Sequence, residues 1–431
     1  MTAGPMRRAV ALGYVFVAAT AIFVATYVLI SMRSLGRFPL DRPSVALLGG
    51  ALMLVFGILT PAEAMASINL DVILLLVGMM ILVSGLDVCG FFDLVSTWIA
   101  SRAKTQFAFL AGLMVAAAFL SAVVLNDAIA LLMTPIVVRS ARTLRVRPVP
   151  YLVALAIAAN VGSVATEIGN PQNAYIAIES GIPFVTFTAA LLPVMLVCLA
   201  LSIGLVWLAF RKDLSAPLSR AAKMPPIRLQ RTGLAVTLGV SVGVVLGFLF
   251  SPSSAWLPLV AIAGGAFVLF FLPFVTTANA RVLVGKVDWT IVIFFVGLFV
   301  IIAGIQVSGL SADITGAFTA AFGGQSGGLA WLTGLSAVLS NLISNVPAVL
   351  LLGEVVKGAG GSHLLWLALA SSSTLAGNAT ILGAACNVIV VQIASREGVE
   401  VSMKEFVKAG LPVTVVTLVV STVLLALLVA A

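Results

Sequence analysis

The sequence carries very little charge. Asp, Glu, Lys and Arg make up only 9% of its 431 residues, whereas an ordinary soluble domain has roughly 25%. Hydrophobic residues account for 61%, and many lie in runs of about 20 residues, which is enough for a helix to cross a membrane. This composition excludes a soluble protein. The long continuous runs also exclude a membrane β-barrel, whose short strands alternate apolar with polar residues.

Residues for catalysis and metal binding are scarce. The three cysteines, Cys89, Cys198 and Cys386, lie far apart in or beside apolar segments, and His363 is the single histidine. This spacing offers neither a disulfide framework nor a metal site, and no pair of nucleophile and base is marked. A GxxxxGK[ST] loop is also missing, which argues against an ATP-driven pump within the chain. We therefore expect no catalytic residues, metal or cofactor.

The apolar runs predict ten membrane crossings and two hairpins. Two further apolar pairs, 107–138 and 330–352, each contain a polar break, at Asn126-Asp127 and at Asn345-Val346-Pro347. We expect these pairs to be re-entrant hairpins, because non-helical backbone at membrane depth is tolerated where protein or a wet cavity shields it. The predicted crossings are 9–30, 44–60, 71–88, 149–180 (interrupted), 184–210, 233–250, 256–275, 287–306, 363–395 (interrupted) and 411–430.

Basic residues are concentrated on one side of this topology. The loops 31–43, 89–106, 139–148, 211–231, 276–287 and 396–410 hold 20 of the 23 Lys and Arg residues. Because Lys and Arg are retained on the cytoplasmic face, we predict a bacterial-type cell-membrane protein with both termini outside. The net charge of +8 thus comes from loop anchors. No stripe of basic and aromatic residues accompanies it, so a nucleic-acid partner is not expected.

Two motifs occur once in each half of the chain. A serine and an asparagine five residues apart recur at an offset of 219, as Ser121 with Asn126 and as Ser340 with Asn345. A TxxGxxxN pattern recurs at an offset of 214, starting at Thr166 and at Thr380. By the charge count the two hairpins enter from opposite sides, which is the inverted repeat of many transporters.

The expected fold is therefore an all-α polytopic membrane protein. It has about ten transmembrane helices, two re-entrant hairpins and an inverted-topology repeat with two broken helices. The first repeat covers 1–210, with hairpin 107–138 and broken helix 149–180. A cytoplasmic linker covers 211–231. The second repeat covers 232–431, with hairpin 330–352 and broken helix 363–395.

The breaks hold neutral polar residues suited to binding a solute. A helix broken in mid-membrane exposes N–H groups at one cut end and carbonyls at the other, for an oxygen-rich solute and a cation respectively. Amide and hydroxyl side chains add donors and acceptors. The candidate binding residues are Asn126, Ser163, Thr166, Gly169, Asn170, Asn173, Ser344, Asn345, Thr374, Asn378, Thr380, Gly383 and Asn387. The alternative is that they satisfy backbone groups freed by the breaks or hold helices together.

Two carboxylates lie in the breaks of the first half. Asp127 is at the first hairpin tip and Glu167 is in the first unwound segment. An ionisable residue at membrane depth is costly, so each is a candidate proton carrier or ligand of a coupling cation. The alternative is a helix-capping role. The second half has Val346 and Ile381 at the matching places, so any coupling chemistry is asymmetric.

The chain resembles the ion-transporter superfamily of ArsB-type arsenite permeases, NhaD-type sodium/proton antiporters, citrate-transporter-like permeases and divalent-anion/sodium symporters. The resemblance rests on Asn-Val-Gly-Ser-Val-Ala-Thr-Glu-Ile-Gly-Asn-Pro-Gln-Asn (160–173), Asn126-Asp127 before Thr134-Pro135, Ser-Asn-Val-Pro (344–347), and Thr-Leu-Ala-Gly-Asn-Ala-Thr (374–380) with Gly383 and Asn387. The chain is most similar to arsenite permeases and to anion permeases with the same GNPQN motif. The resemblance implies a scaffold, a transport unit of hairpins and broken helices, and elevator-like alternating access. Dicarboxylate carriers of the superfamily show Ser-Asn-Thr at both tips, which this chain lacks.

These features favour a secondary transporter of a small inorganic solute. Arsenite or antimonite would be exported in exchange for protons through Asp127 or Glu167. No Arg or Lys lies in the motif core, and a site of Asn, Ser and Thr suits a largely neutral hydroxylated solute. The alternatives are an inorganic-anion or di/tricarboxylate symporter, a sodium/proton antiporter, a channel and a membrane-embedded enzyme. Besides the bilayer, the solute and a coupling proton or sodium ion, a homodimer and a cytoplasmic ATPase subunit are partner hypotheses.

Overall fold

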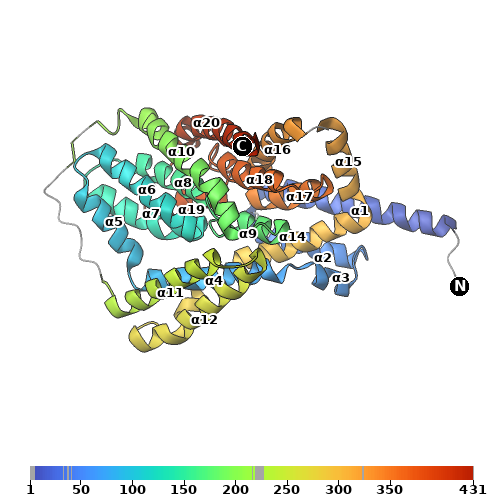
Figure 1. Cartoon of the computed structure of the whole chain (residues 1–431), viewed down its shortest axis with the longest axis horizontal. Coiled ribbons are helices and arrows are strands. Elements are labelled where there is room, and N and C mark those ends of the chain that lie inside the picture. Colours follow the sequence, from blue (N-terminus) through green and yellow to red (C-terminus); the bar gives the residue numbers. More distant parts are fainter. Residues whose placement is uncertain are drawn as a thin grey trace.

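The computed structural model describes residues 5–430 except 33, 36–37, 40, 216, 219–227 and 323–324. Helices dominate it, which confirms the predicted all-α polytopic class (Figure 1). The first half contains α1 (Pro5–Met32), α2 (Arg42–Val55), α3 (Pro61–Ser67), α4 (Leu70–Val88), α5 (Phe91–Arg102), α6 (Gln106–Val123), α7 (Asn126–Thr143), α8 (Val149–Ser163), α9 (Pro171–Ser180) and α10 (Phe184–Phe210). Two short strands, β1 (Ser34–Leu35) and β2 (Phe38–Pro39), pair antiparallel between α1 and α2.

The second half repeats this order of helices. It contains α11 (Arg231–Leu249), α12 (Leu257–Val275), α13 (Ala280–Gly285), α14 (Trp289–Ser308), α15 (Leu310–Phe322), α16 (Gln325–Ile343), α17 (Asn345–Gly358), α18 (His363–Ala376), α19 (Ala385–Arg396) and α20 (Met403–Ala430), with a 3-10 turn η1 (Ser254–Trp256) before α12. The helices thus correspond one to one, from α1 with α11 to α10 with α20. Within the predicted linker, residues 216 and 219–227 lie outside the described residues.

The helices form two layers, one above the other in Figure 1. We call α2, α4, α11, α12 and α14 the scaffold unit, in which α4 packs on α12 and α2 on α14. We call α6–α10 and α16–α20 the hairpin unit, in which α6 packs on α8, α16 on α18 and α10 on α20. The helices α5 and α15 link the two units, since α5 contacts α4 and α7 while α15 contacts α14 and α17.

Close glycine contacts join the scaffold helices in matching pairs. A Cβ atom on Gly78 of α4 would lie 2.4 Å from the backbone carbon of Ala261 on α12. A Cβ atom on Gly297 of α14 would lie 2.4 Å from the same atom of Ala46 on α2. Only glycine permits these approaches without displacing backbone. The matching contacts show that the two halves are built alike in the scaffold unit.

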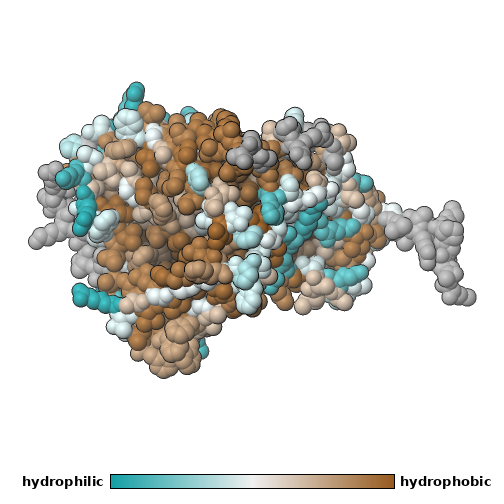
Figure 2. Space-filling model, in the orientation of Figure 1, coloured by the Kyte–Doolittle hydropathy of each residue, from teal (hydrophilic) through white to brown (hydrophobic). Residues whose placement is uncertain are grey.

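The surface fits a membrane environment. Eight helices in the described part of the chain are long and apolar enough to cross a membrane. The face shown in Figure 2 is largely hydrophobic, and Phe250 and Phe274 are 82% and 74% exposed. Large apolar patches of this kind are rare on soluble monomers. Helix α6 reaches 18 residues and is also long enough to cross, although it pairs with α7 as the first arm of a hairpin.

The two hairpin breaks lie slightly earlier in the chain than predicted. The first is at Val124-Leu125, so Asn126 and Asp127 begin α7. The second is the single residue Ser344, and α17 starts at Asn345 with Pro347 in its first turn. Asn and Pro are good residues for a helix start, and they thus mark the beginning of the second arm rather than the gap.

Candidate functional site

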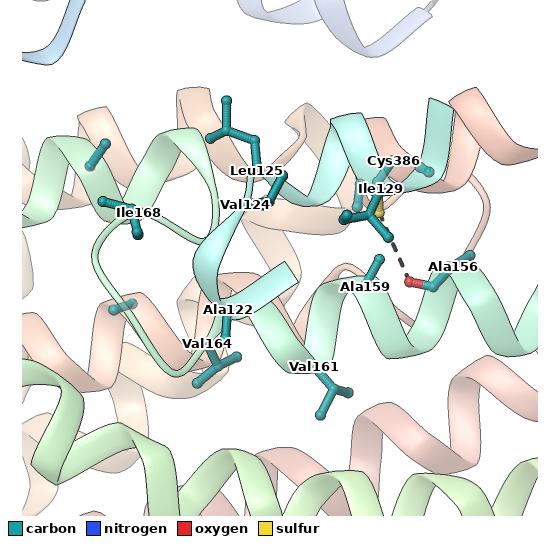
Figure 3. Close-up of a cluster of buried hydrophobic side chains, with 14 of the residues drawn as sticks. Ala122, Val124, Leu125, Ile129, Ala156, Ala159, Val161, Val164, Ile168 and Cys386 are labelled. Atoms are coloured by element: carbon teal, nitrogen blue, oxygen red, sulfur yellow. Dashed lines mark hydrogen bonds between the residues drawn. The ribbon is translucent and has the colours of Figure 1, made fainter. Parts of the chain in front are cut away.

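Both hairpin tips contact the unwound segment of the broken helix in their own half. The backbone N–H of Asn126 donates to the carbonyl oxygen of Gly169 at 2.9 Å. The side-chain amide of Asn345 donates to the carbonyl oxygen of Gly383 at 3.0 Å, in the amide orientation that the surrounding carbonyls require. Figure 3 shows the first tip, at Val124 and Leu125, beside the unwound segment that carries Val164 and Ile168. Each half therefore brings its two repeated motifs together.

The two helix breaks are closed in the same way. Between α8 and α9, Asn173 Nδ2 donates to the carbonyl oxygens of Ser163 at 3.1 Å and Thr166 at 3.0 Å. Between α18 and α19, Asn387 Nδ2 donates to the carbonyl oxygens of Gly377 at 2.7 Å and Thr380 at 3.0 Å. These amide groups satisfy carbonyls freed by the breaks, which is the structural role that the sequence left open.

Glycine is needed in both unwound segments because the backbone passes close to itself there. A Cβ atom on Gly169 would lie 2.5 Å from the carbonyl oxygen of Ser163. A Cβ atom on Gly383 would lie 2.6 Å from the carbonyl oxygen of Gly377. These oxygens accept hydrogen bonds from Asn173 and Asn387 respectively. The Gly and Asn of the TxxGxxxN motif thus cooperate in one tight loop.

The two broken helices hold each other across the centre of the hairpin unit. Asn160 on α8 donates from Nδ2 to Asn378 Oδ1 and Asn387 Oδ1, both at 3.0 Å. In return, Asn170 Nδ2 and Gln172 Nε2 donate to Thr374 Oγ1 on α18, each at 3.2 Å. All of these side chains are buried. The first arm of each broken helix is therefore bound by residues that lie in the break of the other broken helix or just after it.

Asn160 is a central residue that the candidate set omitted. Besides its two donated bonds, its Oδ1 accepts from Asn126 Nδ2 at 3.3 Å and from the Cys386 thiol at 3.0 Å. It therefore joins the first tip to the second break. The repeat offset of 214 aligns Asn160 with Thr374, which is a predicted binding residue. The sequence therefore contains a signal for Asn160. Figure 3 shows Cys386 of α19 against Ala156, which lies on α8 as Asn160 does.

The remaining candidates also border the breaks. Ser163 Oγ donates to the carbonyl oxygen of Asn160 at 2.8 Å, and Asn170 accepts from the backbone N–H of Asn173 as the N-cap of α9. Thr166 Oγ1 donates to the carbonyl oxygen of Ala122. Thr380 Oγ1 lies 3.3 Å from Asn341 Oδ1. The hydrogen bonds thus bring the predicted residues of both halves into one connected region.

Within this region, several buried polar atoms have no hydrogen-bond partner among the described residues. They include both carboxylate oxygens of Glu167, which is fully buried, as well as Asn173 Oδ1 and Asn378 Nδ2. Asp127 is 9% exposed, and no hydrogen bond reaches its carboxylate from the described residues. Neither acid caps a helix, because Asn170 caps α9 and the N-cap of α7 is Leu125. Buried polar groups are normally paired, so these atoms are the ones available to a solute or a proton.

Arg42 brings a positive charge to the second tip, which corrects the expectation that no Arg or Lys lies at the motif core. Its guanidinium donates from Nη1 to Ser344 Oγ at 2.9 Å and from Nη2 to the carbonyl oxygen of Leu382 at 3.4 Å. The apolar runs place Arg42 in the loop 31–43, and the charge count predicts that this loop is cytoplasmic. The sequence contains no signal for this contact, since Arg42 and Ser344 lie about 300 residues apart in different units.

Among the described residues no group of three His, Cys, Asp or Glu side chains could hold a metal.

Comparison with known proteins decides the family. The family model described as "Citrate transporter" matches residues 27–371, which include both hairpins, the first broken helix and part of α18. The chain belongs to this family. It is therefore a multi-pass secondary transporter of the superfamily that the motifs indicated.

Relatives of this citrate transporter family member cover nearly its whole length. An uncharacterised transporter of Mycobacterium tuberculosis is 31% identical, over 95% of this chain and 97% of its own. The rice silicon efflux transporter LSI3 is 27% identical, over 91% of this chain and 94% of its own. The crystal structure of the Alcanivorax borkumensis YdaH transporter superposes with a TM-score of 0.57 at 15% identity, covering 96% of this chain and 98% of that one. This last likeness shows the fold alone.

Proposed function

We propose that the protein exports a small, largely neutral inorganic solute in exchange for protons, with arsenite or antimonite as the favoured solutes. The observation that carries the proposal is the buried cluster of amides and hydroxyls around two carboxylates, Glu167 and Asp127, which have no hydrogen-bond partner among the described residues. Neutral donors and acceptors bind hydroxyl groups without the cost of burying an ion. A carboxylic acid at membrane depth is suited to carrying a proton.

Asn378 Nδ2 and Asn173 Oδ1 supply one donor and one acceptor with no other partner in the described structure. We infer that they bind hydroxyl groups of the solute, together with the other candidate residues at the breaks. Since arsenous acid is largely uncharged at neutral pH, it needs no cation in the site. The rice relative, which is named for silicon efflux, makes silicic acid a further solute to be tested.

A carboxylate or inorganic-anion symporter is the second candidate. Arg42 at the second tip favours it, since a guanidinium recognises carboxylates well, and so does the description of the family model. A sodium/proton antiporter of the same superfamily differs from both by its need for sodium. For each candidate we infer elevator-like movement of the hairpin unit against the scaffold unit.

The test is charge movement in proteoliposomes on a solid-supported membrane. Arsenite, antimonite, silicic acid, sulfate, phosphate, succinate, citrate and sodium are applied as separate concentration steps, with and without a proton gradient. A proton-linked response to arsenite, antimonite or silicic acid alone supports the proposal. A response to citrate, succinate, sulfate or phosphate replaces it with the second candidate, and a response to sodium alone replaces it with the antiporter.

Asp127→Asn and Glu167→Gln identify the proton carrier. The substitution at the carrier is expected to abolish proton-linked current, while counterflow of labelled solute persists because it needs no net proton movement. Asp93→Asn is the matched control, since Asp93 pairs with Arg139 at 2.9 Å on the exposed surface. Full current in both site variants would contradict the coupling role.

Two further inferences accompany this function. The 20 to 3 split of basic residues supports a cell-membrane orientation with both termini outside, which impermeant thiol labelling of cysteines placed near each end would test. A homodimer and a cytoplasmic ATPase subunit are partners that mass measurement of the detergent-purified protein and co-purification would test. Proteoliposomes without ATP already distinguish secondary from ATP-assisted export.

A further inference from the structure

Arg42 connects the scaffold unit to the hairpin unit at the second hairpin tip. It is the first residue of α2, and its side chain binds Ser344 in the second tip and Leu382 in the second break. The scaffold contacts Gly50–Gly297 and Gly265–Gly78 relate α2 to α12 at an offset of 215. At that offset, Arg42 corresponds to Leu257. The position on α12 that matches Arg42 therefore holds no cation for the first tip.

The two tips also lie differently against the scaffold unit. An apolar cavity of about 330 Å³ lies beside the first tip, lined by Leu120, Val123 and Val124 of the hairpin together with residues of α4 and α11. The second tip is instead joined to α2 through Arg42. We infer from the two hydrogen bonds of Arg42 to the hairpin unit that the structure shows one end position of this unit.

Ser344 is held in a backbone conformation that L-residues rarely adopt. Its φ is 78° and its ψ is 161°. Such conformations are strained and persist only where the surroundings enforce them. The hydrogen bond from Arg42 to Ser344 Oγ is a scaffold contact made at this strained residue. We therefore expect the tip to relax when the hairpin unit moves away from Arg42.

The charge of Asp127, a candidate proton carrier, acts on Arg42. Arg42 and Asp288 both interact electrostatically with Asp127, and Cys386 is a further titratable group in its range. Asp288 is the N-cap residue of α14, so it belongs to the scaffold unit as Arg42 does. A partly desolvated guanidinium needs anionic partners. An ionised Asp127 supplies one from the hairpin unit, whereas a neutral Asp127 does not.

We propose that Arg42 is a positioning residue that retains the hairpin unit in this end position while Asp127 is ionised and releases it when Asp127 is neutralised. This rests on the proposed coupling role of Asp127. The contact would make movement of the hairpin unit depend on the charge of the proton carrier. Binding of a proton would thus be tied to the conformational step without any contact between Arg42 and the solute.

The test measures the position of the hairpin unit directly, by distances between two spin labels in proteoliposomes from pH 5.5 to 8.5. The labels are attached at Arg281→Cys on α13 and Lys404→Cys on α20, both exposed positions. The native cysteines are buried, so they do not compete for the label. The unsubstituted pair is expected to show two distance populations whose ratio changes with pH.

Arg42→Gln is expected to change this ratio by about tenfold at high pH, as for the loss of one hydrogen bond to a charged group. Asp127→Asn should give the same shift and remove the pH dependence. The double variant should add nothing further, since both changes break one contact. Arg42→Lys keeps the charge and should restore part of the pH dependence. Lys286→Gln is the matched control, because Lys286 pairs with Asp87 at 2.6 Å.

An unchanged ratio in Arg42→Gln at every pH would overturn the proposal. So would a loss of solute affinity with an unchanged ratio, because Arg42 would then bind the solute itself. The distance measurement needs no solute. It can therefore succeed where arsenite export fails, or fail where export is observed, so the two proposals are tested separately.

Discussion

Asn160 on α8 donates its side-chain amide to Asn387 on α19 at 3.0 Å, so the intact arm of one broken helix is bound to the break of the other. Asn387 in turn uses its own amide to satisfy two carbonyls of its break. The two halves of the chain are thus joined through side chains that also maintain the unwound backbone. We therefore expect the hairpin unit to behave as one body.

Asn160→Ala is expected to destabilise the hairpin unit by about 2–4 kcal/mol, because Asn378 Oδ1 and Asn126 Nδ2 lose a buried partner and each unpaired group costs about 1–3 kcal/mol. Thermal unfolding in detergent measures the effect. Asn279→Ala is the matched control, since Asn279 only caps the short helix α13 at an exposed position. An equal loss of stability in both variants would show that the hydrogen bonds of Asn160 contribute no more to stability than an exposed helix cap does.

Glu167→Gln is expected to leave the unfolding temperature equal to that of the wild type or higher, while proton-linked transport falls. The neutral amide has nearly the same shape, and it removes a buried acid whose oxygens have no partner in the described structure. A residue kept for function at the expense of stability behaves in this way. Unfolding followed by tryptophan fluorescence, together with charge movement on the same preparation, checks both parts. A marked drop in unfolding temperature would instead assign Glu167 a structural role.

Much of this architecture is visible in the sequence, for physical reasons. Long apolar runs predict α4, α10 and α14 directly, and the offsets of 219 and 214 identify the matched breaks, because duplicated structure keeps its spacing. The contact of Arg42 with Ser344 has no such signal. It depends on how the scaffold unit and the hairpin unit pack against each other, which hydropathy and spacing within one segment do not encode. The charge of Arg42 also fits the topology rule, so nothing in the sequence marked it as unusual.

Gly78→Ala and Gly297→Ala are expected to destabilise the protein by similar amounts, about 1–3 kcal/mol each, because each added methyl group would lie 2.4 Å from a backbone carbon of the opposing helix. Similar losses would support the equivalence of the two scaffold contacts. Gly239→Ala on α11 is the control, since nothing lies within 4 Å of its Cβ position, and there alanine should stabilise the helix by about 0.5–1 kcal/mol. Unfolding in mixed micelles with increasing SDS measures all three, and a stable Gly78→Ala variant would contradict the close packing of α4 on α12.

Lys357→Gln is expected to weaken the contact between α9 and α17. Lys357 Nζ lies 2.5 Å from Glu179 Oε2 and 3.1 Å from Glu354 Oε1, so its removal leaves two acids side by side without their cation. The pair is partly exposed, and solvent screening limits the loss to about 1 kcal/mol. High salt should reduce the loss further, because it screens the repulsion between the acids. Adding Glu179→Gln to Lys357→Gln should restore most of the stability in thermal unfolding at low salt. If the double variant is less stable than Lys357→Gln alone, Glu179 acts chiefly through its bond from Asn69 Nδ2 at 3.0 Å, which joins α9 to the scaffold unit.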